Sequence, residues 1–405
     1  MKKIKFSDLY TISSGISSTK EQAGHGSPFL SFSTVFNNFF IPDKLEDLMD
    51  TSESEQKTYS IKSGDIFLTR TSEVIDELAM SSVALKDYPN ATYSGFLKRL
   101  RPIDGLKTYP KFMAFYLRTP LFRKTITNNA TMTLRASFNE TIFSYLDLLL
   151  PDYSEQKKIG DFLYLINQKI ALNKQINARL EEMAKTLYDY WFVQFDFPDT
   201  DGKPYKSSGG EMVFDETLKR EIPKGWGSIE LQSCLAKIPN TTKILNKDIK
   251  DFGKYPVVDQ SQDFICGFTN DEKSILNPQD AHIIFGDHTR IVKLVNFQYA
   301  RGADGTQVIL SNNERMPNYL FYQIINQIDL SSYGYARHFK FLKEFKIILP
   351  SKDISQKYNE IANTYFVKVR NNIKQNHQLT QLRDFLLPML MNGQVSVTCS
   401  GARDG

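Results

Sequence analysis

Residues 148–198 read LLLPDYSEQKKIGDFLYLINQKIALNKQINARLEEMAKTLYDYWFVQFDFP, and Gly160 is the only glycine in this stretch. No proline occurs between Pro151 and Pro198. Glycine and proline are the residues that most weaken a helix, so this composition favours one long helix that begins after Pro151. Asp152 and Ser154 are candidate residues for capping its first turn.

The same arrangement occurs again 199 residues further along the chain. Residues 347–350 read IILP where residues 148–151 read LLLP, and a Ser/Gln/Lys segment follows each motif, at 154–157 and at 355–357. Upstream of each motif, a proline stands where a helix is expected to begin, at Pro110 and at Pro317. The chain is therefore predicted to be a globular part followed by a long helix, twice.

The two predicted helices share a heptad pattern. With Ile159 as position a, both series are mostly apolar at positions a and d, as in helices that pair along one seam. Lys169 and Lys368 stand at the same d position, and Asn173 and Asn372 at the same a position. These matches favour pairing of the two helices with each other, and the repeat order and intervening domains allow that pair to be antiparallel, although each helix could instead pack on its own globular part. The residues expected to pair the helices are Ile166, Asn173, Leu180, Met183 and Leu187 in the first and Tyr365, Asn372, Leu379, Leu382 and Leu386 in the second.

These patterns predict an α+β fold with a pseudo-two-fold internal repeat, in which two mixed α/β domains are separated by two long antiparallel coiled-coil helices. The predicted domains are residues 1–151 and 201–350, the latter including a linker. The predicted helices cover residues 152–200 and 351–396, and a tail covers 397–405. A helix of about 35 residues spans roughly 50 Å, or roughly 15 base pairs of DNA, which suits a protein that recognises two separated half-sites.

Composition excludes several classes of protein. Hydrophobic residues make up 41% and charged residues 24% of the 405 residues, as in globular rather than disordered chains. The three cysteines lie far apart and form no CxxC pair, which argues against a disulfide scaffold or a cysteine zinc site. No secretion signal and no stretch of 18 apolar residues is found, so we expect a cytoplasmic protein without membrane contact.

Charge is unevenly distributed behind a net value of only +4. Residues 86–139 contain ten Lys/Arg and two Asp, a net of +8, whereas residues 43–57 carry a net of −4. Residues 281–346 are less basic, with a net of +3. A basic segment of this kind is expected on a surface that faces an anionic polymer such as double-stranded DNA, although it is also consistent with solvated lysines and arginines.

Polar clusters follow several short apolar strands, and they contain residues suited to nucleic-acid contact. Arginine presents a fork that matches guanine or phosphate, and Ser, Thr and His can contact the backbone or base edges. Each cluster is also consistent with an ordinary turn. The candidate DNA-binding residues are Thr69, Arg70, Lys98, Arg99, Arg101, Arg135, Ser137, His288, Thr289, Arg290, Arg301, Arg337 and His338.

The stretch at 148–198, together with GKPYKSSGGEM at 202–212 and EIPKGW at 221–226, resembles the DNA specificity subunits of bacterial type I restriction-modification systems. The resemblance covers nearly the whole chain, but the first domain begins without a Pro-Lys-Gly-Trp motif. It implies two target-recognition domains that each read half of a bipartite DNA site, with the helices setting the spacer. It also implies partners in phage defence: two modification subunits that use S-adenosylmethionine to methylate adenine, and two restriction subunits that can join with ATP and Mg²⁺.

The sequence contains none of the catalytic motifs expected of a methyltransferase or an ATP-binding enzyme. It has neither a glycine-rich methyltransferase loop with an (Asn/Asp)-Pro-Pro-aromatic motif nor a GxxxxGK[ST] phosphate loop. Asp152, Glu155 and Lys157 superficially resemble a nuclease motif but stand where a helix begins, and His282 and His288 have few companions for a metal site. We therefore expect no catalytic residue, metal or cofactor in this chain. The alternatives are a stand-alone nuclease or methyltransferase, and a scaffold whose coiled coil only assembles partners.

Overall fold

The computed structural model describes residues 1–72, 78–104, 107–129, 131–132, 136–238, 241–303, 305–334 and 337–397. The chain folds into two compact units, Met1–Ala171 with Asn376–Gly405, and Leu172–Gln375. Each unit therefore combines one globular part with segments of both long helices. Of the predicted tail, 397–405, only Val397 belongs to the described residues.

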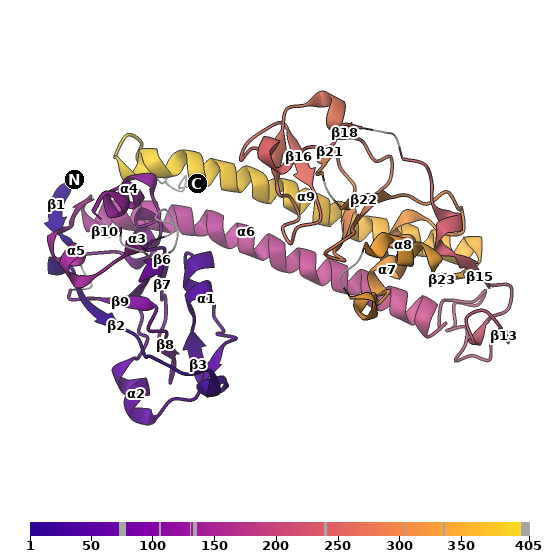
Figure 1. The fold of residues 1–405 in the computed structure, drawn as a ribbon, viewed down its shortest axis with the longest axis horizontal. Helices are drawn as coiled ribbons and strands as arrows, with labels where there is room; N and C mark the ends of the chain where they lie inside the picture. The colour runs from indigo at the N-terminus through magenta and orange to yellow at the C-terminus, as the bar shows by residue number, and fades with distance from the viewer. Residues whose placement is uncertain are drawn as a thin grey trace, which may run out of the picture. The chain divides into compact units, whose positions relative to one another are not determined.

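The first unit is an α+β domain built on several small sheets. Its four-stranded sheet has the order β2-β9-β5-β7 (Tyr10–Ser14, Leu97–Pro102, Ile66–Thr69, Ser81–Val83). Figure 1 draws this part of the chain in indigo and purple. Its other sheets are β4-β3-β8 (Leu48–Met49, Ala23–Leu30, Thr92–Tyr93), β1-β12 (Lys2–Lys5, Asp147–Leu150) and β10-β11-β6 (Thr131–Met132, Ala136–Ser137, Thr71–Ser72). Its short helices are α1 (Phe32–Asn37), α2 (Glu53–Thr58), α3 (Pro110–Tyr116), α4 (Pro120–Asn129) and α5 (Glu140–Tyr145).

The second unit has a related arrangement. Its sheets are β20-β19-β22 (Val292–Val295, His282–Gly286, Thr306–Ile309), β17-β16-β21-β18 (Gly267–Thr269, Tyr255–Val258, Tyr299–Arg301, Ile275–Leu276), β15-β23 (Gly227–Glu230, Lys346–Leu349) and β13-β14 (Met212–Asp215, Arg220–Pro223). Its short helices are α7 (Asn318–Gln327) and α8 (His338–Glu344).

The predicted repeat is present in the strand pairing. Strand β12 contains the LLL of the first motif and pairs antiparallel with β1, with Lys2 opposite Leu150. Strand β23 contains the IIL of the second motif and pairs antiparallel with β15, with Gly227 opposite Leu349. Each motif strand thus closes its own domain by pairing with a strand from the start of that domain.

The two long helices are α6 (Tyr153–Tyr188) and α9 (Lys352–Met391), drawn from magenta to pink and in yellow in Figure 1. The Asp152 side chain accepts a hydrogen bond from the Glu155 amide at 2.9 Å and so caps the first turn of α6, as expected. Helix α6 ends earlier than the predicted residue 200, because residues Asp189–Val193 form a π-helical turn in which Trp191 and Phe192 are buried.

Antiparallel packing of α6 and α9 is evident within each unit. In the second unit, the Tyr358 hydroxyl donates to the Ala184 carbonyl at 3.0 Å, and Asn173 bonds Gln375. In the first unit, Asn376 donates to the Ile170 carbonyl at 3.2 Å. The core of the first unit also includes Ile159, Leu163, Leu387 and Leu390. Each domain therefore packs on both helices, rather than on its own helix alone.

The seam between the helices differs by one residue from the predicted d positions. The buried residues of α6 include Ile159, Leu163, Ile166, Ile170, Asn173, Leu180 and Ala184. The expected a positions are therefore correct, but each d position moves to the following residue. In α9 the same shift places Ala362, Val369 and Leu390 in the interior. Lys169 and Lys368 are exposed and do not interrupt the seam.

Two residues that were expected to pair the helices point outward instead. Met183 is 50% exposed and Leu382 is 45% exposed. The physical reason is the shifted seam, because the following residues Ala184 and Arg383 take the inner positions. Ile166 and Leu180 are buried, and Leu187, Tyr365, Asn372, Leu379 and Leu386 are half-buried.

Asparagine and glutamine side chains form a polar layer in the seam. The Asn173 amide donates to Gln375 Oε1 at 2.7 Å, and the Asn372 amide donates to Asn177 Oδ1 at 2.8 Å. Asn173 is fully buried. Polar residues inside a helix seam lower stability but favour one register over others. The two matched asparagines thus lie in the seam as predicted, each bonded to a different residue of the opposite helix.

Among the described residues, no helix combines the length and the apolar character needed to cross a lipid bilayer.

Substituting Asn173 tests the polar layer. Asn173→Ala should lower the free energy of unfolding by about 1–3 kcal/mol, because it removes the hydrogen bond to Gln375 and leaves space at a fully buried position of the seam. Urea unfolding monitored by circular dichroism measures the loss. Lys169→Ala, at an exposed position of the same helix, is the control and should change stability by less than about 0.5 kcal/mol. Equal effects of the two substitutions would contradict a structural role for the layer.

Candidate nucleic-acid interface

Several candidate residues of the first unit lie where strand β5 ends. Arg70 follows this strand directly, and its amide donates to the Phe96 carbonyl at 2.8 Å. The Arg70 carbonyl accepts from the Phe138 amide at 2.9 Å, just before α5. We call residues 69–70, 94–96 and 138–140 the first corner. It brings together three segments that are far apart in the sequence.

The second unit contains an equivalent corner where strand β19 ends. The Asp287 amide donates to the Gly305 carbonyl at 2.7 Å, and the Asp287 carbonyl accepts from the His338 amide at 2.9 Å, just before α8. We call residues 286–290, 305 and 337–339 the second corner. The matching backbone bonds make Asp287 the equivalent of Arg70, and Gly305 the equivalent of Phe96.

Both corners lead into a capped short helix. Asn139 Oδ1 accepts from the Ile142 amide at 2.9 Å at the start of α5. Asp287 Oδ1 accepts from the Phe339 amide at 2.8 Å at the start of α8. The buried Asp287 therefore stabilises the fold, and the exposed chemistry of the second corner belongs to its neighbours.

Only one candidate of the first corner is exposed, namely Arg70. Thr69 is fully buried, and its hydroxyl accepts from the Met80 amide at 2.9 Å. Lys98 is 5% exposed and bonds Ser14 at 2.8 Å and Glu140 at 2.9 Å. The hydrogen bond and the charge of Lys98 lower the pKa of the Glu140 carboxyl, which keeps it ionised beside Arg70.

Arg99 and Arg101 are engaged elsewhere in the first unit. Arg101 forms a bidentate ion pair with the fully buried Asp65, at 2.6 and 2.7 Å. Arg99 donates to the Ser60 carbonyl at 2.7 Å and lies over the Tyr93 ring, 5.4 Å from its centroid. Both guanidinium groups hold the 58–65 segment on the sheet. These contacts assign the two side chains a structural role.

The second corner presents a short polar loop. Thr289 and Arg290 are exposed and His288 is half-exposed. Gln260 holds this loop, because its side-chain carbonyl accepts from the His288 amide at 3.2 Å and its backbone carbonyl accepts from the Thr289 hydroxyl at 2.8 Å. Arg290 adopts a positive φ of 63°, which turns the chain back toward strand β20.

The remaining candidates occupy different surroundings. Arg337 is exposed at the start of α8. His338 is 2% exposed, and its two ring nitrogens face the Asp287 and Gly334 carbonyls at 3.0 Å. Arg301 is half-buried in the sheet of β16 and β21, outside the second corner. Arg135 and the side chain of Ser137 lie outside the described residues.

Phe96 and Glu140 also belong to the first corner, and Gln260 holds the loop of the second, although the sequence patterns did not single these residues out. Phe96 follows a Ser-Gly pair between two apolar strands, which is a turn signal that could have indicated an exposed aromatic residue. Glu140 and Gln260 carry no such signal, because only the fold brings them to the strand ends.

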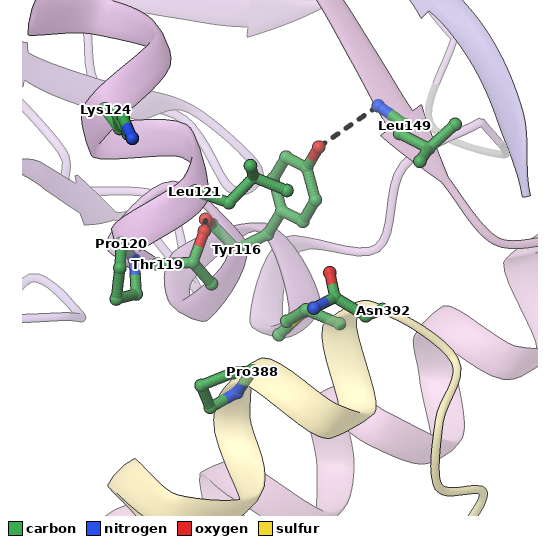
Figure 2. Close-up of a pocket in the computed structure, with 9 residues that line it drawn as sticks. Tyr116, Thr119, Pro120, Leu121, Lys124, Leu149, Pro388 and Asn392 are labelled. Atoms are coloured by element: carbon green, nitrogen blue, oxygen red, sulfur yellow. Dashed lines mark hydrogen bonds between the residues drawn. The ribbon is translucent and has the colours of Figure 1, made fainter.

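The pocket in Figure 2 lies beside the end of α9 in the first unit. Its lining includes Leu121, Leu149 and Pro388, and the Tyr116 hydroxyl accepts from the Leu149 amide at 3.1 Å. None of the described residues that line it is an acid, a histidine or a cysteine. Its chemistry is that of an apolar surface pocket with one lysine, Lys124, at its edge.

No group of three or more metal-ligating side chains occurs within the described ranges. His282, considered above as a possible ligand, is 7% exposed and contacts the Tyr299 hydroxyl at 3.1 Å. Burial lowers the pKa of His282 to about 4, so the ring is neutral at neutral pH. This histidine is part of the core of the second unit.

Comparison with known proteins connects this geometry to a family. Residues 1–182 match the family described as "Type I restriction modification DNA specificity domain". The chain is 26% identical over 339 residues to the type I restriction enzyme MjaIX specificity subunit of Methanocaldococcus jannaschii, covering 78% of this chain and 75% of the relative. It is 25% identical over 439 residues to the HindI specificity subunit of Haemophilus influenzae, covering 91% and 94%.

The fold has a solved counterpart. The crystal structure of the type I restriction-modification S subunit from M. genitalium superposes with a TM-score of 0.57 at 16% identity, covering 96% of this chain and 95% of that one. It shares the α+β arrangement around two long helices. The family match over the first 182 residues and the two relatives agree, so this chain is similar in sequence to the DNA specificity subunits of type I restriction-modification systems.

Proposed function

We propose that the two corners each read one half of a bipartite DNA site. The observation that carries this proposal is the double occurrence of one backbone arrangement, in which a strand end, a turn and a helix start are bonded in the same way. Each occurrence presents exposed basic residues, Arg70 in the first corner and Arg290 and Arg337 in the second. The side chains differ between the corners, so the two half-sites should differ in sequence.

The proposed contacts use the chemistry of arginine and hydroxyl groups. Arginine can donate two hydrogen bonds to guanine O6 and N7 in the major groove, or bind phosphate. Thr289 and His288 add shorter groups that can contact the backbone or a base edge. Candidates that are engaged inside the protein, such as Lys98 and Arg101, would support the corners rather than contact DNA.

Chemistry in these systems belongs to other subunits, because the specificity subunits are non-catalytic and hold no cofactor. We assign the methyl donor S-adenosylmethionine to two modification subunits. Restriction subunits with ATP and Mg²⁺ would join the same complex. The present chain would determine which DNA sequence the complex binds.

The long helices would set the distance between the two half-sites. They contain 36 and 40 residues and pack antiparallel in both units. In this proposal residues 1–151 and 201–350 act as target-recognition domains, and residues 152–200 and 351–396 act as the spacer.

One face of α6 has the character of a docking surface for a modification subunit. Leu172, Ile176 and Met183 are 49%, 39% and 50% exposed. Their spacings of four and seven residues place them on one stripe of the helix, beside the seam. Exposed apolar stripes of this kind commonly mark protein interaction sites.

Binding selections with randomised bipartite DNA test the corners. Arg70→Ala in the assembled methyltransferase should relax sequence preference in one half-site only, with at least about a tenfold loss of affinity for the preferred sequence. Arg290→Ala should relax the other half only. The recognised motif itself can be read from the methylome of cells that carry the system.

Arg101→Ala is the matched control for Arg70→Ala. It leaves the buried Asp65 carboxylate unpaired, so it should destabilise the first unit by about 3 kcal/mol while the sequence preference of the folded fraction is kept. Relaxation of both halves by a single corner variant, or of neither half, would contradict the assignment of one corner to each half-site.

Helix insertions test the spacer. Seven residues added in phase to both α6 and α9 lengthen each helix by about 10.5 Å, which should increase the tolerated spacer by about 3 base pairs. Methylome sequencing of cells with the altered chain measures the spacer. An insertion in α6 alone should disrupt the seam and abolish methylation. An unchanged spacer in the doubly extended chain would show that the helices do not set it.

A charge in the apolar stripe tests the docking surface. Ile176→Glu should lower the amount of modification subunit that co-purifies with the chain, because a carboxylate would have to be buried at the interface. Gln175→Glu introduces the same charge at the exposed neighbouring position and should leave co-purification intact. Equal recovery with both variants would place the docking surface elsewhere.

A further inference from the structure

Phe96 is a large apolar side chain on the open surface of the first corner. It lies in the turn between β8 and β9 and is 62% exposed. Single exposed apolar residues are common and need no explanation in themselves. What distinguishes Phe96 is the backbone that holds it and the polar side chains that line the pocket beside it.

The backbone around Phe96 is fixed by close contacts. Its amide donates to the Ser94 hydroxyl at 3.2 Å, and its carbonyl accepts from the Arg70 amide at 2.8 Å. The preceding Gly95 donates to the Ile16 carbonyl at 2.7 Å. A Cβ atom on Gly95 would lie 2.9 Å from that carbonyl oxygen, and one on Gly15 would lie 2.2 Å from the Ser94 oxygen. Two glycines thus allow the turns at 15–18 and 94–96 to pack directly on each other.

A rigid turn matters because ordering a flexible loop on binding costs free energy. Both backbone groups of Phe96 are already bonded, so the side chain projects from a backbone whose position is fixed. This is the property expected of a side chain that measures the shape of a ligand, rather than of one that adapts to it.

Most of the side chains that line the pocket around the ring are polar. Its lining includes Ser17, Ser18, Arg70 and Ser94, with Phe96 as the exposed aromatic group. Arginine and hydroxyl groups match the phosphates and hydrogen-bonding base edges of DNA, whereas the phenyl ring matches none of these. The one apolar group on the major-groove edge of DNA is the C5-methyl group of thymine, and phenylalanine is among the residues that contact it.

We propose that Phe96 is a specificity-determining residue that packs on the C5-methyl group of a thymine in the half-site read by the first corner. This inference rests on the proposed function of the first corner and names one base that the corner would recognise. Gly305 takes the equivalent place in the second corner and has no side chain to make such a contact. Thymine recognition of this kind is therefore confined to one half-site.

Replacement of thymine by uracil removes only the methyl group, so it isolates this contact. The test uses the complex of the full chain with its modification subunits and duplexes that carry the methylome-derived motif. Each thymine of both halves is replaced by deoxyuridine, one at a time. With the unmodified chain, the replacement at one position in one half-site should weaken binding by about tenfold. This is the lower end of the effect expected when one apolar carbon is removed from a well-shaped contact.

Phe96→Ala should bind the thymine duplex about tenfold more weakly and should no longer distinguish thymine from uracil at that position. Phe96→Leu keeps an apolar side chain and should retain part of the discrimination. Since the side chain is exposed, both variants should fold, and their thermal unfolding checks this. Arg70→Ala, whose loss concerns a different base, should still distinguish thymine from uracil.

Four results would overturn the proposal. Uracil could be tolerated at every position, or Phe96→Ala could keep the full difference between thymine and uracil. Phe96→Ala could also weaken motif and unrelated DNA equally, as a non-specific wedge would, or reduce recovery of the modification subunit, as a docking residue would. If motif binding by the unmodified complex remains specific in these cases, the proposed function of the corner stands and only the role of Phe96 fails.

Discussion

The antiparallel packing of α6 against α9 is the interaction on which the rest of the structure depends. The core of the first unit includes Ile159 and Leu163 from α6 together with Leu387 and Leu390 from α9. The core of the second includes Ala184 and Tyr188 from α6 together with Tyr358 and Ala362 from α9. Neither domain could complete its core on one helix. A change in the helix register would therefore alter both domains at once, and the polar layer in the seam favours one register over others.

The duplicated corners separate two tasks within one fold. Backbone hydrogen bonds set the position of the strand end, the turn and the helix start in both units, and they do not depend on side-chain identity. Arg70 in the first corner is equivalent to Asp287 in the second, and Phe96 is equivalent to Gly305. A chain built in this way can present different chemistry to two half-sites without any change in its architecture.

The long helices and the repeat were predictable because they depend on local patterns. The absence of proline and glycine from most of 152–197 indicates a helix whatever surrounds it, and the equivalent asparagines Asn173 and Asn372 indicate a shared seam. The exact seam was not predictable. Phe162 and Leu163 are both apolar and adjacent, and residues at i+3 and i+4 lie on nearly the same helix face. Only packing against the partner helix and the domain decides which of them is buried.

The corners were predictable only in part. Arg70 and Arg290 follow apolar strands, so their exposure could be expected from the sequence. The burial of Lys98 and Arg101 depends on Glu140 and Asp65, which lie 42 and 36 residues away along the chain. Likewise, the equivalence of Phe96 and Gly305 appears only when the backbone bonds of the two units are compared, because the turns differ in length and sequence.

Site-specific cross-linking tests the central claim, that each corner faces its own half-site, most directly. A photo-reactive phenylalanine analogue is placed at Phe96 in one preparation and at Thr289 in another, and each is assembled with modification subunits on a duplex carrying the motif. Each probe is expected to cross-link within one half-site, and the two probes are expected to mark opposite halves. Cross-links from both probes in the same half, or only in the spacer, would contradict the claim.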